Sequence, residues 1–236
     1  MEESDTPWVS NLVPVPKKAT GEIRVCIDFR KLNAITIPDR YPLQRLERII
    51  EKLSGCHWFT TLDMAQGFFQ IPITEDAKQK CGIITEDRVY RMKVLPFGLV
   101  NATCIYSRVM HMILKGIEQV TNYVDDVIIH TKSEDPREHL KVLRQVFSRL
   151  REFNMKVKPQ KCEFLKKSVK FLGHTVNKDG YTLAVSNLKA IKEFPQPKTD
   201  KQLKRFVGMC NFYRKFINGF SLIVEPLNSL LRKGIK

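Results

Sequence analysis

The chain has 236 residues, of which 43% are hydrophobic, so it can bury a substantial core and is not a largely disordered protein. Its 40 basic against 25 acidic residues give a net charge of +15, which favours a polyanionic partner such as a nucleic acid. No apolar run approaches the ~20 residues that span a bilayer, so we expect no membrane partner and a cytoplasmic location. The six cysteines lack the Cys-x-x-Cys spacing of zinc sites and are expected to be reduced core residues.

The first predicted element is a hairpin of two strands, residues 8–15 and 23–29, joined by a basic turn with a glycine. Alternation along the second strand places Arg24 on a polar face, opposite the apolar residues. Lys17 in the turn and Arg24 can therefore converge on a triphosphate, Lys as a point charge and Arg as a planar fork. The alternative is a solvated hairpin, because exposed Lys and Arg are the norm.

An amphipathic helix is predicted next, beginning at Pro42 and ending at Leu53. After it, the aromatic and β-branched run from Trp58 indicates a buried strand that delivers the carboxylate of Asp63 at its end. Asp63 as the N-cap of the following segment is the competing interpretation.

Residues 95–102 form the entry to a second predicted helix, which presents Ile105, Tyr106 and Ile113 along its apolar side. Gly98 in this entry turn lets another backbone or a planar base approach closely. An ordinary helix-entry turn explains the same residues equally well.

Asp125 and Asp126 lie between two apolar runs, a pattern that indicates strand, two-residue turn and strand. A tight turn can aim neighbouring carboxylates at a common cation, although Asp also favours turns for local reasons. With Asp63 they make three acids from two strands, a set able to hold two metal ions for phosphoryl transfer. Hard oxygen ligands favour two Mg²⁺ ions, with Mn²⁺ as a substitute.

The remaining elements are a helix from Pro136 with Asp135 as its N-cap, a strand over 169–176, and a helical segment from about residue 184. In that segment Thr199 and Gln202 form a capping box. Its basic residues are expected to grip a nucleic-acid backbone, with a solvated amphipathic helix as the alternative.

Four stretches in this order resemble the successive motifs of reverse transcriptases, most closely those of gypsy-type long-terminal-repeat retrotransposons, and the resemblance covers nearly the whole chain. The four stretches are residues 62–69, 95–102, 123–126 and 171–174. The run from Phe206 to Ile217 is also typical of the segment that follows the polymerase core.

The resemblance implies an α+β right-hand polymerase fold. Residues 1–57 would be partial fingers and the start of the palm, residues 58–183 the palm with a fingers insertion around 74–94, and residues 184–236 a helical thumb. In the family a ribonuclease H domain normally follows such a segment. We expect that domain to be absent from these 236 residues, so a ribonuclease H domain or a homodimer would be a partner. In an intact element the protein would lie in a virus-like particle.

By the same resemblance, the site extends primers with dNTPs on an RNA or DNA template. Asp63, Asp125 and Asp126 match the catalytic, metal-binding acids, and the carbonyl of Met64 would complete one metal site. The residues that match dNTP contacts are Lys17, Arg24, Phe68, Phe97, Gly98 and, as the lysine that protonates the leaving pyrophosphate, Lys161. Phe68 would exclude a 2′-OH. Residues matching the primer grip are Phe171, Leu172, Gly173 and His174.

Residues 103–107 depart from the family pattern of Pro and Ala followed by an aromatic and Gln. A second hypothesis is therefore a catalytically inactive nucleic-acid-binding remnant. A third is another two-metal enzyme, such as a nuclease. The Phe68 gate and the Lys17 and Arg24 pair argue against a nuclease, which needs neither a sugar gate nor a triphosphate clamp.

Overall fold

The structure is a computed structural model that describes residues 1–16, 21–183, 189 and 191–232. The chain divides into two compact units. The first comprises residues 1–172 and 176–181, and the second comprises residues 173–175 and 182–236. Lys17 and the domain boundary expected near residue 184 lie outside the described residues.

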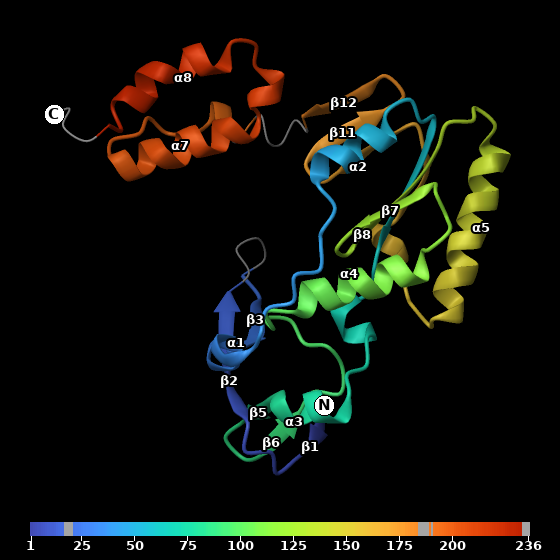
Figure 1. Ribbon diagram of the computed structural model, residues 1–236, viewed down its shortest axis with the longest axis vertical. Helices are drawn as coiled ribbons and strands as arrows, with labels where there is room; N and C mark the ends of the chain where they lie inside the picture. Colours follow the sequence, from blue (N-terminus) through green and yellow to red (C-terminus); the bar gives the residue numbers. More distant parts are fainter. Residues whose placement is uncertain (17–20, 184–188, 190, 233–236) are drawn as a thin grey trace. The chain divides into compact units, whose positions relative to one another are not determined.

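A four-stranded antiparallel sheet forms the centre of the first unit (Figure 1). Its order is β7 (Val120–Tyr123), β8 (Asp126–Thr131), β4 (Trp58–Asp63) and β9 (Glu163–Lys166). The β-branched and aromatic residues of β4 and β8 suit a strand that is covered on both faces. This sheet matches the buried strand and the hairpin expected around the acids.

Helices cover both faces of this sheet. On one face Val127 and Ile129 join a core cluster with residues of α4 (Ala102–Ile113) and α5 (Pro136–Glu152). On the other face Ile128 packs with Ile49 and Leu53 of α2 (Leu46–Leu53). Consecutive residues of β8 therefore serve two different cores, because side chains alternate along a strand.

A buried histidine ties α5 to the sheet. His139 Nε2 lies 2.8 Å from Thr60 Oγ1 of β4, and His139 Nδ1 lies 3.0 Å from Thr131 Oγ1 of β8. Both ring nitrogens are thus engaged, which fixes the ring orientation. Asp135 caps α5 as predicted, accepting a hydrogen bond from the backbone N–H of Arg137.

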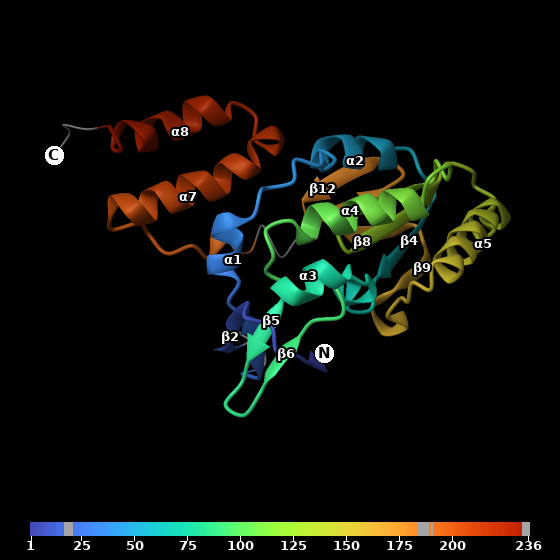
Figure 2. The ribbon, with the colours of Figure 1, turned by 60° about the horizontal axis from the view of Figure 1, so that its bottom comes forward.

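The N-terminal part of the first unit holds a five-stranded sheet (Figure 2). Its order is β1 (Glu2–Glu3), β6 (Val89–Arg91), β5 (Gly82–Ile84), β2 (Val9–Pro16) and β3 (Ile23–Ile27). Two short helices accompany it, α1 (Arg30–Ile35) and α3 (Glu75–Lys80). The hairpin expected at the N-terminus is the β2–β3 pair. Its apolar residues are solvent-exposed, with Ile23 at 68% and Val25 at 59%.

Two element boundaries differ from the sequence predictions. The helix expected from Pro42 begins at Leu46, and its N-cap Arg45 has an extended backbone. The strand expected over 169–176 is a hairpin of β10 (Ser168–Phe171) and β11 (His174–Asn177). Leu172 and Gly173 form its turn with φ of 48° and 78°. Together with β12 (Gly180–Leu183) these strands make a third sheet.

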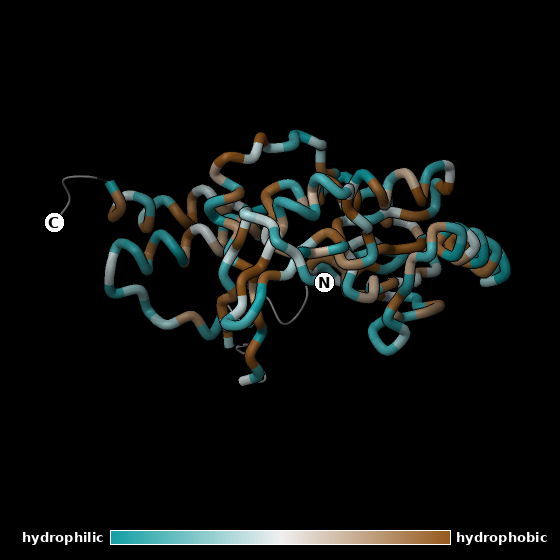
Figure 3. The backbone as a smooth tube through the Cα atoms, turned by 90° about the horizontal axis from the view of Figure 1, so that it is seen from below, coloured by the Kyte–Doolittle hydropathy of each residue, from teal (hydrophilic) through white to brown (hydrophobic). Residues whose placement is uncertain are grey.

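The second unit contains α7 (Asp200–Phe212), the 3₁₀ helix η3 (Arg214–Phe216) and α8 (Phe220–Ser229). Thr199 caps α7 by accepting a hydrogen bond from the N–H of Gln202, as predicted, but the Gln202 side chain accepts from the N–H of Lys198 and not from that of Thr199. Figure 3 shows hydrophobic and hydrophilic residues interspersed along both long helices. Among the described residues, no helix combines the length and apolarity needed to cross a bilayer.

Candidate metal and nucleotide site

Two of the predicted acids face each other across neighbouring strands. Asp63 ends β4 and Asp126 begins β8, and the two are partners in the antiparallel register. Directly opposed residues have Cβ atoms about 4.5–5.5 Å apart, so their carboxylates share one face of the sheet. The strand pairing alone therefore brings together acids that are 63 positions apart in the chain.

Asp125 occupies the turn between β7 and β8, where Tyr123 pairs with Asp126. The preceding Val124 has φ of 53°, a left-handed conformation that is uncommon for a β-branched residue. Backbone strain of this kind is typical of functional sites. The Asp125 Oδ1 atom is buried and has no hydrogen-bond partner among the described residues.

The electrostatics of the three acids reflect their proximity. Burial raises the pKa of Asp125, and the carboxylates of Asp126 and Asp63 raise it further. Burial and Asp63 likewise raise the pKa of Asp126, while Lys161 acts in the opposite direction. The Lys161 Nζ atom lies 3.2 Å from Asp63 Oδ2. These pKa values are raised because like charges lie close together in a partly desolvated site. A bound cation would relieve that repulsion.

The acids fit divalent cations by their chemistry. An orphaned, buried carboxylate oxygen and two raised carboxyl pKa values mark a site with too little positive charge. As they stand, no three His, Cys, Asp or Glu side chains in the described parts of the chain form a set that could hold a metal ion. Lys161 instead neutralises Asp63, and Asp125 Oδ1 is directed at Gly67.

A cavity of about 220 Å³ opens beside the paired acids. Its walls include Asp63, Asp126 and Lys161, together with Lys170 and Phe171 of β10. Phe171 is buried in the same core cluster as Ile128. Two predicted primer-grip residues, Phe171 and Leu172, thus line the same cavity as the acids.

The remaining predicted primer-grip residues, Gly173 and His174, belong to the second unit. His174 is 5% exposed, and its ring centroid lies 6.0 Å from that of Phe216 and 6.5 Å from that of Phe212.

An aromatic cluster adjoins Asp125. Phe68 packs against Phe97 at a centroid distance of 4.7 Å and against Tyr106 at 5.0 Å. The guanidinium of Arg24 lies 5.4 Å from the centroid of Phe97. Gly98 has φ of 95°, a conformation that favours glycine. The structure therefore brings four of the six predicted dNTP contacts, Arg24, Phe68, Phe97 and Gly98, into one region.

Three other features near the site were not predicted. The Gln70 side chain donates to the carbonyl oxygens of Ala65 at 2.6 Å and Lys156 at 2.9 Å, and accepts from the Lys156 N–H at 2.6 Å. Met64 pairs with Val157 in an isolated antiparallel bridge. The Asp63 carbonyl oxygen accepts a hydrogen bond from the N–H of Lys158. These contacts hold the end of β4 to residues 156–158, and no sequence pattern signalled them.

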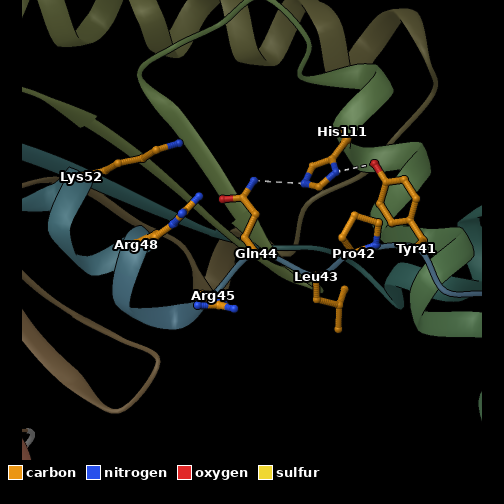
Figure 4. A pocket seen from close by; sticks show the side chains of 8 residues that line it. All are labelled: Tyr41, Pro42, Leu43, Gln44, Arg45, Arg48, Lys52 and His111. Atoms are coloured by element: carbon orange, nitrogen blue, oxygen red, sulfur yellow. Dashed lines mark hydrogen bonds between the residues drawn. The ribbon is translucent and has the colours of Figure 1, made fainter.

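A larger cavity, of about 560 Å³, shares no lining residue with the cavity beside the acids and was also not predicted (Figure 4). His111 of α4 holds one wall in place, with Nδ1 2.7 Å from the Tyr41 hydroxyl and Nε2 3.2 Å from Gln44 Nε2. The rest of the lining consists of Pro42, Leu43 and three cations, Arg45, Arg48 and Lys52, and it contains no acid. The only feature of the sequence that pointed to this cavity was the group of basic residues at positions 45–52.

Residues 15–176 match the family model described as reverse transcriptase (RNA-dependent DNA polymerase). The chain is 42% identical over 242 residues to a Pol polyprotein from transposon 297 of Drosophila melanogaster. It is 37% identical over 238 residues to that of transposon gypsy from the same organism. The alignments cover 100% and 97% of this chain, and 23% of the length of each relative.

Among solved structures, the foamy viral protease-reverse transcriptase in complex with double-stranded DNA is similar, with a TM-score of 0.90 and 30% identity over 97% of this chain and 40% of that one. The same protein in complex with an RNA/DNA hybrid gives a TM-score of 0.84 and 29% identity, covering 99% of this chain and 31% of that one. These matches confirm the right-hand polymerase fold. With its family model matched over residues 15–176 and its acids brought together on β4 and β8, the chain belongs to the reverse transcriptase family.

Proposed function

We propose that this chain is the polymerase part of a reverse transcriptase, which extends a primer 3′-OH with dNTPs on an RNA or DNA template. The observation that carries the proposal is the register of β4 and β8, which sets Asp63 opposite Asp126 with Asp125 beside them. Family membership and the relatives, which are retrotransposon Pol polyproteins, support the same activity.

In this proposal the palm comprises the four-stranded sheet and its helices, the fingers comprise the N-terminal sheet with residues 74–94, and the thumb is the helical segment from about residue 184. The foamy viral neighbours are titled as complexes with DNA and with an RNA/DNA hybrid, which supports template-primer as the partner. The basic cavity of Figure 4 would contact phosphates of that nucleic acid. A homodimer or a ribonuclease H domain would be a further partner, in the cytoplasm or a virus-like particle.

Each side chain has a proposed role in the reaction. Asp63, Asp125, Asp126 and the Met64 carbonyl would hold two Mg²⁺ ions or, in their place, Mn²⁺. When bound, such ions lower the pKa of the primer hydroxyl and neutralise the charge on the departing pyrophosphate.

The surrounding residues would position the substrates. Lys161, at 3.2 Å from Asp63, would move to the leaving group and donate a proton there. Arg24 and Lys17 would bind the triphosphate, and Phe97 and Gly98 would contact the incoming nucleotide. Residues 171–174, the predicted primer grip, would hold the primer end, since Phe171 and Leu172 line the cavity beside the acids.

The test is primer extension on poly(rA)/oligo(dT) and on poly(dA)/oligo(dT), with dTTP and Mg²⁺ or Mn²⁺. We expect dTTP incorporation on both templates and its complete loss with EDTA. Incorporation that continues in EDTA would contradict the metal-dependent mechanism. Template-primer binding without any incorporation would instead identify the inactive remnant, and degradation of the template-primer would identify a nuclease.

Phe68→Val is expected to relax the selection against ribonucleotides. The Phe68 ring is 6% exposed and fixed between Phe97 and Tyr106, so it cannot yield to an additional 2′-oxygen. Loss of this steric exclusion should raise the ratio of rUTP to dTTP incorporation roughly 10- to 100-fold. Single-nucleotide incorporation kinetics with each nucleotide would measure the ratio.

The matched control is Phe69→Val, which makes the same replacement of a ring by a smaller side chain at the neighbouring position. Phe69 also packs against Phe97, at a centroid distance of 5.1 Å, but belongs with a different core cluster. Its substitution should leave the ratio unchanged. An equal change in both variants would show that Phe68 acts through general packing and not as a steric gate.

A further inference from the structure

Two buried polar atoms next to each other have no partner among the described residues. They are the hydroxyl oxygen of Tyr106 and Oδ1 of Asp125. Tyr106 is 0% exposed, and its ring is held against Phe68 on the buried side of α4. A buried donor and a buried acceptor that both lack partners are unfavourable separately and complementary together.

The position of Gly67 shows how close these two atoms are. A Cβ atom at Gly67 would lie 2.7 Å from Asp125 Oδ1 and 3.1 Å from the Tyr106 hydroxyl. Both oxygens therefore border the space that a side chain at residue 67 would occupy. The two oxygens thus lie no more than about 6 Å apart, and neither has a hydrogen-bond partner in the described part of the chain.

The phenol is the only one of the two groups that can donate, because an ionised carboxylate only accepts. The carboxylate needs one such donor on its buried side, where solvent does not reach Oδ1. A hydrogen bond to Oδ1 would fix the plane of the carboxylate and leave Oδ2 directed away from Gly67. In many proteins, hydrogen bonds of this kind orient the carboxylates that bind a metal ion.

We propose that Tyr106 is a positioning residue, whose hydroxyl donates a hydrogen bond to Asp125 Oδ1 and so orients Asp125 for divalent-cation binding. The inference rests on the proposed function, because it assigns Asp125 to the metal site. The two packed aromatic residues would then have different roles. Phe68 would contact the sugar, and Tyr106 would hold the Asp125 carboxylate in place.

Tyr106→Phe tests the proposal by removing one oxygen atom and keeping the ring that packs on Phe68. Mn²⁺ would be titrated into each protein alone, and free Mn²⁺ would be measured by electron paramagnetic resonance. We expect the Mn²⁺ dissociation constant to rise about tenfold. In primer extension, the Mn²⁺ concentration for half-maximal rate should rise in parallel, while the KM for template-primer and the Tm remain unchanged.

Ser107→Ala is the matched control, because the Ser107 hydroxyl lies on the same helix and is also buried without a hydrogen-bond partner among the residues that the structure describes. It should leave Mn²⁺ affinity unchanged. Equal Mn²⁺ affinity of Tyr106→Phe and the unaltered chain would overturn the role of Tyr106 and leave the polymerase proposal standing. Failure of the unaltered chain to bind Mn²⁺ would overturn both.

Discussion

Asp125→Asn is expected to lower primer extension about 1,000-fold or more while raising the Tm of the metal-free protein. The loss of rate follows because an amide cannot supply the charge that holds a divalent cation, whose contribution to the transition state is several kcal/mol. The gain in stability follows because Asp125 is partly buried beside Asp126 and Asp63, so its ionised form is unfavourable in the folded chain.

The pH dependence gives this prediction a second readout. The folded-state pKa of Asp125 is raised, so the folded chain binds this proton more tightly than the unfolded chain does. The contribution of Asp125 to the free energy of unfolding should therefore fall as pH rises from about 4, its unfolded pKa, through the raised folded pKa. In thermal unfolding with EDTA, the Tm of Asp125→Asn should exceed that of the unaltered chain at pH 7 but not at pH 4. Retained extension activity in Asp125→Asn would remove Asp125 from the catalytic set.

Gly67→Ala is expected to lower primer extension roughly 100-fold and to destabilise the protein by about 1–3 kcal/mol. Gly67 does not have a positive φ, so alanine meets no backbone strain, and the whole effect comes from the added methyl. That methyl would lie 2.7 Å from Asp125 Oδ1, closer than a carbon can approach. Either Asp125 or the 3₁₀ helix η1 (Gly67–Gln70) must shift, and a shift of about 1 Å at a catalytic group can cost 100-fold in rate.

Gly208→Ala is the control for this prediction. Gly208 lies within α7, and a Cβ atom there would meet nothing within 4 Å. Because Gly in a helix interior costs about 0.5–1 kcal/mol relative to Ala, this variant should be slightly more stable. Urea unfolding and primer extension on both variants would separate the two cases. Full activity in Gly67→Ala would show that the region around Asp125 is looser than the structure indicates.

The sequence predicted the elements whose signals are local. The strand ending at Asp63 and the hairpin at Asp125 and Asp126 follow from apolar runs and a two-residue turn. The helix from Pro136 follows from its Asp135 cap. These signals depend only on neighbours along the chain. The structure confirms each element, although the hairpin turn is Val124–Asp125, one residue earlier than predicted, and Asp126 begins β8.

The start of α2 could not be read in the same way. Tyr41 and Gln44 make hydrogen bonds to His111, about 70 residues away, and the backbone at Arg45 is extended. Tertiary contacts have overridden a local preference that favoured a helix from Pro42. The hairpin at residues 172–173 explains how Phe171 and Val176 join one core cluster. In a continuous strand these two side chains, five residues apart, would point to opposite faces.

For the site, the residue pattern indicated the three acids and the resemblance added Lys161, Phe68 and others, but neither indicated which side chains would touch the acids. That Lys161 reaches Asp63, that Gly67 abuts Asp125, and that Tyr106 lies beside both are consequences of packing between distant segments. Residue patterns specify which face of a helix or strand is buried. They do not specify which side chain of another element it will meet.

The pairing of Asp63 with Asp126 also constrains the number of residues in β4. Each residue added to or removed from β4 moves its later side chains to the opposite face, so a single insertion between Trp58 and Asp63 would turn the acid away from its partner without changing any residue type. The exposed turn at residues 85–88, between β5 and β6, has no such dependence. Insertions should therefore be tolerated in that turn and forbidden in β4, which makes the spacing of this strand as restrictive as its composition.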